Sequence, residues 1–253
     1  MASLKDKSGN ILDRRNFLKL GLLTTASALT SNLAKASEKP LKAVNNSPLK
    51  QYAAKKFDHL IGGTLKDISD NQLKAHFKLY EGYITKINEL ETRIKNFKID
   101  SPDTINYRGW HMDQTNMLNG AVLHELYFSN LGSTDKEPQK LLKKMIDRDF
   151  GTVQNFVGHL KAVGKLSHGW SLAALNYRTG KLNVYGLERH NLNVPVMTHP
   201  ILVLDVYEHA YMIDYGTDRG KYLDAFVANL NWKPVEERLE SALAIPFGES
   251  VTA

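Results

Sequence analysis

Residues 201–211 read Ile201-Leu202-Val203-Leu204-Asp205-Val206-Tyr207-Glu208-His209-Ala210-Tyr211. The first four residues of this stretch are a short, continuous apolar run, which predicts a buried strand. A carboxylate and an imidazole follow directly after that strand, four positions apart, at Asp205 and His209. In isolation, such a pair more often forms a salt bridge on a helix than a metal site. Its meaning therefore depends on the rest of the chain.

Upstream of this stretch, alternating apolar segments are separated by Arg178-Thr179-Gly180-Lys181, which predicts a hairpin turn. Helical patterns precede the hairpin and resume at about Ala210. Residues 136–253 are therefore expected to form an α+β domain with a small, three-stranded antiparallel sheet. Its expected elements are helices at 136–148 and 152–165, strands at 170–177, 182–185 and 201–204, and further helices from about residue 210.

Residues 51–135 have the pattern of a helical domain. Apolar side chains recur at intervals of three and four over 69–97, which predicts a long amphipathic helix. Ser69, with Gln72 three residues later, predicts a capping box at its start. A second helix is expected over 113–131, with Gly132 ending it. Two long helices joined by a short polar connection predict an antiparallel hairpin.

The chain of 253 residues contains no cysteine, so disulfides, thiolate catalysis and Cys-ligated metal sites are excluded. Any bound metal must be held by His, Asp or Glu. The net charge of +6 would favour nucleic-acid binding, but the first 36 residues contribute +4 of it. The remaining chain is nearly neutral and lacks the basic surface that phosphate backbones require. We therefore expect no nucleic-acid partner.

The first 36 residues have the three parts of an export signal. Arg14-Arg15-Asn16-Phe17-Leu18-Lys19 is similar to a twin-arginine motif, an apolar run follows over 20–29, and Ala34-Lys35-Ala36 is a small-residue cleavage site. The alternative is a frayed basic helix. We interpret 1–36 as a signal peptide and 37–50 as a flexible leader. The mature chain is expected to be exported to the periplasm, with no membrane anchor once the signal is removed.

The Asp205–Tyr215 stretch resembles the Asp-Val-Trp-Glu-His-Ala-Tyr-Tyr signature of the iron/manganese superoxide dismutase family. Other segments resemble the family's motifs in the same order along roughly residues 50–240. These segments are the helix around 73–88, the run Leu118-Asn119-Gly120-Ala121-Val122-Leu123-His124, Phe150-Gly151-Thr152, Gly169-Trp170 and Asn231-Trp232.

The resemblance implies one iron or manganese ion per subunit, with His76, His124, Asp205 and His209 as ligands. It also implies disproportionation of superoxide to oxygen and hydrogen peroxide, with Tyr83 as the active-site tyrosine and Trp170 beside it. Three imidazoles and one carboxylate suit either metal. The alternative is a metal-binding but catalytically weak relative in the cell envelope.

The chain departs from the family pattern at the entrance to the site. His76 and Tyr83 are seven positions apart where the family has eight, and Tyr80-Glu81 stands where the family has His-His. Met212 replaces a tyrosine that, in most members of the family, meets a first-helix histidine across the dimer interface. These changes imply a rebuilt substrate gateway rather than a lost metal site.

Two positions bear on the choice of metal. In the iron and manganese branches of the family, a glutamine lies beside the metal-bound solvent and comes from one of two chain positions. This chain has Gly120 at the first position and His190 at the second. His190 would donate to that solvent, with Gly120 leaving space opposite, and the resemblance then leans weakly towards iron. The alternative is that the loop alignment slips and His190 is a surface residue.

The resemblance also implies a homodimer, or a dimer of dimers, joined near the metal sites. In the family, the glutamate of Glu-His-Ala reaches a metal-bound histidine of the other subunit. Glu208 and His209 retain both halves of this link. The alternative is that Glu208 is simply an exposed residue.

Overall fold

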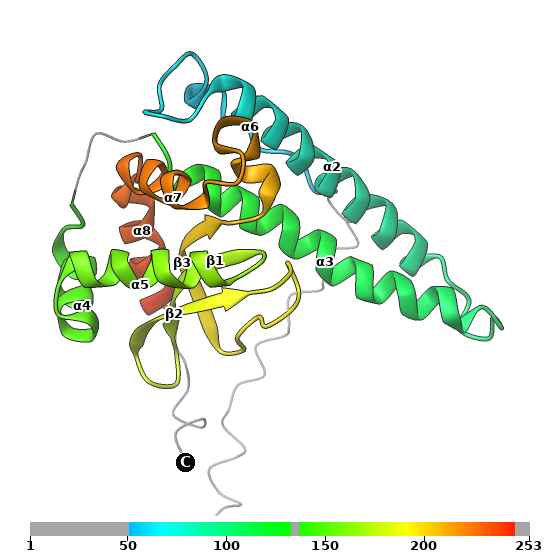
Figure 1. Cartoon of the computed structure of the whole chain (residues 1–253). Helices are drawn as coiled ribbons and strands as arrows, with labels where there is room; N and C mark the ends of the chain where they lie inside the picture. Colours follow the sequence, from blue (N-terminus) through cyan, green and yellow to red (C-terminus); the bar gives the residue numbers. More distant parts are fainter. Residues whose placement is uncertain (1–50, 133–136, 246–253) are drawn as a thin grey trace, which may run out of the picture. The chain divides into compact units, whose positions relative to one another are not determined.

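The computed structural model describes residues 51–132 and 137–245 (Figure 1). The predicted signal peptide and leader lie outside the described residues, as does the predicted domain boundary at 135/136. The elements are η2 (Asp58–Leu60), α2 (Asp70–Lys95), α3 (Thr104–Ser129), α4 (Lys140–Phe150), α5 (Val153–Leu166), β1 (Trp170–Asn176), β2 (Lys181–Leu187), β3 (Thr198–Asp205), η3 (Glu208–Ala210), α6 (Met212–Tyr215), α7 (Arg219–Ala228) and α8 (Trp232–Leu243). The predicted α+β class is confirmed.

Helices α2 and α3 form the predicted antiparallel hairpin and extend well beyond the sheet (Figure 1). The predicted start of the second helix was wrong, because α3 begins at Thr104 rather than at 113. Its first turns pack against the end of α2, where Phe97 stacks on Tyr107 with ring centroids 3.9 Å apart. With no core beneath it, this part of the helix needs no regular apolar stripe.

The predicted capping box at the start of α2 is half correct. Ser69 Oγ accepts a hydrogen bond from the main-chain N–H of Gln72 at 3.1 Å. The Gln72 side chain does not return the bond. Instead, the Asp214 carboxylate accepts from both the main-chain N–H and the hydroxyl of Ser69, at 2.7 and 2.6 Å. A residue distant in sequence thus completes the cap, and this ties α6 to the start of α2.

The sheet has the order β2-β1-β3, and both strand pairs are antiparallel. The third strand is longer than predicted because it includes Pro200, which the apolar run did not cover. Proline lacks an N–H and is tolerated on an edge strand beside a bulge. The register of β1 with β3 shifts between Ala173 and Ala174, next to Pro200. This local irregularity explains why the strand can pass through a proline.

The sheet positions the ends of its strands against the helices. Helix α5 packs on β1 and β2, whereas α3 and α8 pack on β3. Fully buried Trp170, Phe128 and Leu204 belong to the core between these elements. Strand β3 delivers Asp205 to a buried position between the sheet and the hairpin.

In the part of the chain that the structure describes, no helix has the length and apolar character needed to cross a membrane.

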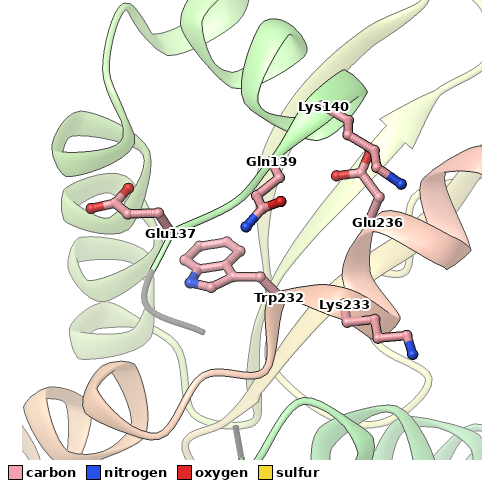
Figure 2. Close-up of a pocket in the computed structure, with 6 residues that line it drawn as sticks. All are labelled: Glu137, Gln139, Lys140, Trp232, Lys233 and Glu236. Atoms are coloured by element: carbon pink, nitrogen blue, oxygen red, sulfur yellow. The ribbon is translucent and has the colours of Figure 1, made fainter. Parts of the chain in front are cut away.

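A hollow at the start of α4 has a structural explanation (Figure 2). Helix α4 has no cap from its own N-cap residue, Gln139. The carboxylate of Glu236, on α8, accepts instead from the main-chain N–H groups of Leu141 and Leu142, at 3.0 and 3.3 Å. The carboxylate thereby satisfies donors at the helix start. None of the residues lining this hollow belongs to the predicted metal site.

Candidate metal centre

Four residues that are distant in sequence converge between the hairpin and the sheet. His76 lies on α2, His124 on α3, Asp205 at the end of β3 and His209 in η3. Each offers one ligand atom, and these atoms all lie within 4.8 Å of one another. They are the four ligands that the resemblance implied. The structure thus brings together all four residues predicted to hold the metal.

The Asp205 carboxylate lies at the centre of this cluster. Its Oδ2 is 3.1 Å from His76 Nε2, 3.2 Å from His209 Nε2 and 3.5 Å from His124 Nε2. Transition-metal ions bind imidazole nitrogen and carboxylate oxygen at about 2 Å. Ligand atoms around one ion are therefore about 3–4 Å apart, so these separations fit a single mononuclear ion.

His124 gives independent evidence that the cluster suits a metal. Its Nδ1 lies 2.6 Å from the main-chain oxygen of Gly120, and only a protonated Nδ1 can donate there. The neutral ring then carries a lone pair on Nε2. This atom is buried and has no hydrogen-bond partner among the described residues. A buried polar atom without a partner is costly, and a metal ion would supply one.

The protonation states also suit metal binding. Burial lowers the pKa of His76 and lowers that of His124 well below its usual value. Burial alone would raise the pKa of Asp205, but the neighbouring His209 and His76 hold it well below its usual range. His76 and His124 are thus neutral and Asp205 is ionised, which are the forms that coordinate metals.

Surrounding hydrogen bonds hold Asp205 in place. Its Oδ1 accepts from the main-chain N–H of Tyr207 at 2.9 Å, which leaves Oδ2 facing the histidines. The Tyr222 hydroxyl donates to the main-chain oxygen of Asp205 at 2.7 Å. Sequence reasoning missed Tyr222, which lies beyond the motif and has no distinctive spacing from it.

Gln72 holds the His209 segment in the same way. Its side-chain amide donates to the main-chain oxygen of His209 at 2.6 Å, and its side-chain oxygen accepts from the main-chain N–H of Ile213 at 3.1 Å. This use of Gln72 was also missed, because its spacing from Ser69 matches a capping box.

Tyr83, His190 and Trp170 form a hydrogen-bonded chain beside the ligands. Trp170 Nε1 donates to His190 Nδ1 at 2.9 Å, and His190 Nε2 lies 2.7 Å from the Tyr83 hydroxyl. Burial lowers the pKa of His190 to about 4, so its ring is neutral at neutral pH. An indole can only donate, so the single ring proton is on Nε2 and is directed at Tyr83. The expectation that His190 donates directly to a metal-bound solvent was therefore wrong, because its one N–H is bonded to the Tyr83 hydroxyl. His190 is buried, so the alternative of a surface residue is wrong.

The spacing of seven between His76 and Tyr83 fits a continuous α-helix. Seven residues make nearly two turns, so both side chains leave α2 on the same face. The Tyr83 ring then lies 5.2 Å from the His124 ring, measured between centroids. Gly120 makes room for it, because a Cβ at that position would lie 2.8 Å from Tyr83 Cδ1. Burial raises the pKa of Tyr83 to about 12, so its hydroxyl stays protonated.

The site opens to solvent beside His209. The side chains of His76, His124 and Asp205 are at most 1% exposed, whereas that of His209 is 29% exposed. His209 and Tyr83 line a surface cavity together with His190 and Tyr207. A small anion could reach the cluster from this cavity. Glu208 is exposed, and its carboxylate forms no hydrogen bond or ion pair with another described residue.

The fold and the site define a mononuclear metalloprotein with three histidines and one aspartate beside a solvent-filled cavity. Comparison with known proteins agrees. Residues 138–238 match the family model described as iron/manganese superoxide dismutases, C-terminal domain. The superoxide dismutase [Fe] of Aquifex aeolicus is 39% identical over 193 residues, which cover 74% of this chain and 91% of that protein.

More distant relatives carry either metal in their names. The superoxide dismutase [Fe] of Methanothermobacter thermautotrophicus is 34% identical, over 70% of this chain and 88% of the relative. The superoxide dismutase [Mn] 1 of Halobacterium salinarum is 30% identical, over 69% and 88%. This chain belongs to the iron/manganese superoxide dismutase family.

Proposed function

We propose that this protein is a superoxide dismutase, with His76, His124, Asp205 and His209 as the ligands of one iron or manganese ion. The observation that carries the proposal is the convergence of four ligand atoms within 4.8 Å. A bound ion would supply the one-electron redox couple that oxidises one superoxide anion to oxygen and reduces a second to hydrogen peroxide, with uptake of two protons.

The residues beside the ligands are suited to handle those protons. Because His190 donates to the Tyr83 hydroxyl, that hydroxyl has its own proton free to donate into the cavity beside the ligands. The high pKa of Tyr83 keeps that proton in place at neutral pH. Tyr83 therefore acts as a hydrogen-bond donor to the anion or its reduced form, and His190 orients it.

The test must separate this enzyme from the alternative of a catalytically weak metal-binding relative in the envelope. The mature protein is loaded with iron or with manganese, and the decay of superoxide is followed in each case. We expect catalytic decay proportional to metal content, with iron giving the higher rate. Stoichiometric metal binding without faster decay would favour the weak relative.

We further propose a homodimer, or a dimer of dimers, joined on the side where the metal site opens. The exposed carboxylate of Glu208 is one residue from His209 and is free to meet a partner subunit. A dimer by light scattering at micromolar concentration, weakened by Glu208→Ala, is expected. A monomer under the same conditions would contradict this arrangement.

We also propose that residues 1–36 direct export through the twin-arginine route and that the mature protein works in the periplasm. Arg14 and Arg15, the apolar run over 20–29 and the cleavage pattern at 34–36 support this. The twin-arginine route carries folded proteins, which suits an enzyme that must acquire its metal before export.

A further inference from the structure

The loop between β2 and β3 carries His190 in a tight turn. The main-chain N–H of Leu192 is bonded to the oxygen of Arg189 at 3.4 Å, and these two residues form an isolated bridge. His190 lies inside this turn, outside any regular strand. The position of its ring therefore depends on what holds the turn against the rest of the protein.

Two amide side chains fasten the turn to α3. Asn119 Nδ2 donates to the main-chain oxygen of His190 at 2.9 Å. Asn191 Nδ2 donates to the main-chain oxygen of Met112 at 3.2 Å and to Thr115 Oγ1 at 3.0 Å. Of these contacts, only the one from Asn119 reaches His190 itself.

Asn119 also has a fixed relationship to the metal cluster. It is on α3, next to Gly120 and five residues before His124. The same helix therefore places a predicted metal ligand and, through Asn119, the main chain of His190. Movement of the turn away from α3 would lengthen both the Trp170–His190 bond and the His190–Tyr83 bond.

We propose that Asn119 is a positioning residue, whose hydrogen bond to the His190 carbonyl keeps the Trp170–His190–Tyr83 chain aligned with the metal cluster. The part that concerns catalysis rests on the proposed dismutase function. Among the described residues, Asn119 forms no hydrogen bond with any of the four predicted metal ligands. It acts through the turn, so its loss should loosen the chain while the four ligands stay in place.

The test uses the mature chain with and without metal. In the metal-free protein, the variants Asn119→Ala and Asn119→Asp are compared by hydrogen exchange of the three tryptophan indole N–H groups. Asn119→Asp has the same shape but cannot donate to a carbonyl. We expect the Trp170 indole to exchange at least about tenfold faster in both variants, with Trp232 unchanged. Asn106→Ala, which removes a bond to Asp103 in the first turn of α3, is the matched control and should leave both unchanged.

The metal-loaded variants should keep their metal content, and the pH dependence of superoxide removal should shift relative to that of Asn106→Ala. Unchanged Trp170 exchange in both Asn119 variants would overturn the proposal. Equal acceleration at Trp170 and Trp232 would also overturn it, because Asn119 would then support only the general stability of the fold. The exchange measurement requires no dismutase activity, so its failure is distinguishable from failure of the proposed function.

Discussion

The side chain of Gln72 bonds the main-chain oxygen of His209, with 2.6 Å between its amide nitrogen and that oxygen. Gln72 is in the first turn of α2, and His209 is in the segment that follows β3. This bond, together with the one to Ile213, fixes the ligand-bearing segment to the helix that carries His76. Gln72 is 1% exposed, so water cannot readily replace it.

Replacement of this residue should weaken the metal site without removing a ligand. Gln72→Leu keeps a similar volume but removes the partners of the main-chain oxygen of His209 and the main-chain N–H of Ile213, both in partly buried bonds. We expect metal affinity to fall about tenfold or more and the free energy of unfolding to fall by about 1–3 kcal/mol. Competition with a chelator measures the first and denaturant unfolding the second.

The matched control is Asn71→Leu, which replaces an exposed amide in the neighbouring position of α2. It should leave the metal affinity unchanged. If the two variants retain metal equally well, Gln72 has no part in holding His209.

His190 should tune the metal's reduction potential rather than hold the metal. Its Nε2–H is the donor to Tyr83, so it acts on the metal site through that hydroxyl. His190→Ala should therefore shift the potential and cut superoxide turnover at least about tenfold, a barrier change of about 1.4 kcal/mol. Metal content should stay nearly intact, and His190→Gln, which keeps a donor, should recover part of the rate. Full activity of His190→Ala with either metal would place His190 outside the reacting site.

The low pKa of His190 predicts a pH dependence of stability in the metal-free protein. The unfolded chain takes up a proton on this ring at about pH 6.5, whereas the folded protein resists protonation down to about pH 4. The stability contributed by the neutral ring is thus present above pH 6.5 and is lost as the pH falls. The loss by pH 4 is at most about 3 kcal/mol.

Denaturant unfolding between pH 7 and 4 measures this loss. His190→Gln cannot titrate, so its stability should fall less steeply over the same range. The remaining fall belongs to other buried groups, such as His76 and His124, whose pKa values are also lowered by burial. Parallel slopes for the two proteins would show that His190 is not held neutral by the fold.

The sequence predicted the long hairpin, the three strands and all four clustered residues because each has a local or family-wide pattern. It missed Gln72, Tyr222 and Asn119, whose partners are main-chain oxygens in distant segments. Every residue has a main-chain oxygen, so the sequence does not show which of these oxygens a given side chain will bond. The early start of α3 was missed because its first turns pack against the end of α2 and have no regular apolar stripe.

The export signal makes a separate prediction. Arg14→Lys combined with Arg15→Lys should keep the protein in the cytoplasm, in folded and active form, because the pair is recognised by the export machinery. Cell fractionation followed by an activity assay measures the distribution. The single substitution Lys5→Arg, which lies before the motif, serves as the control and should leave export normal. Normal export of the double variant would indicate the general secretory route.

His76, His124, Asp205 and His209 are expected to bind one redox-active metal ion that removes superoxide. The most direct measurement follows metal content and superoxide decay together in the wild type, His124→Ala and Asp205→Ala. We predict one iron or manganese ion per wild-type chain, and loss of both metal and activity in each variant. A variant that keeps full metal occupancy, or wild-type activity unrelated to metal content, would contradict the account.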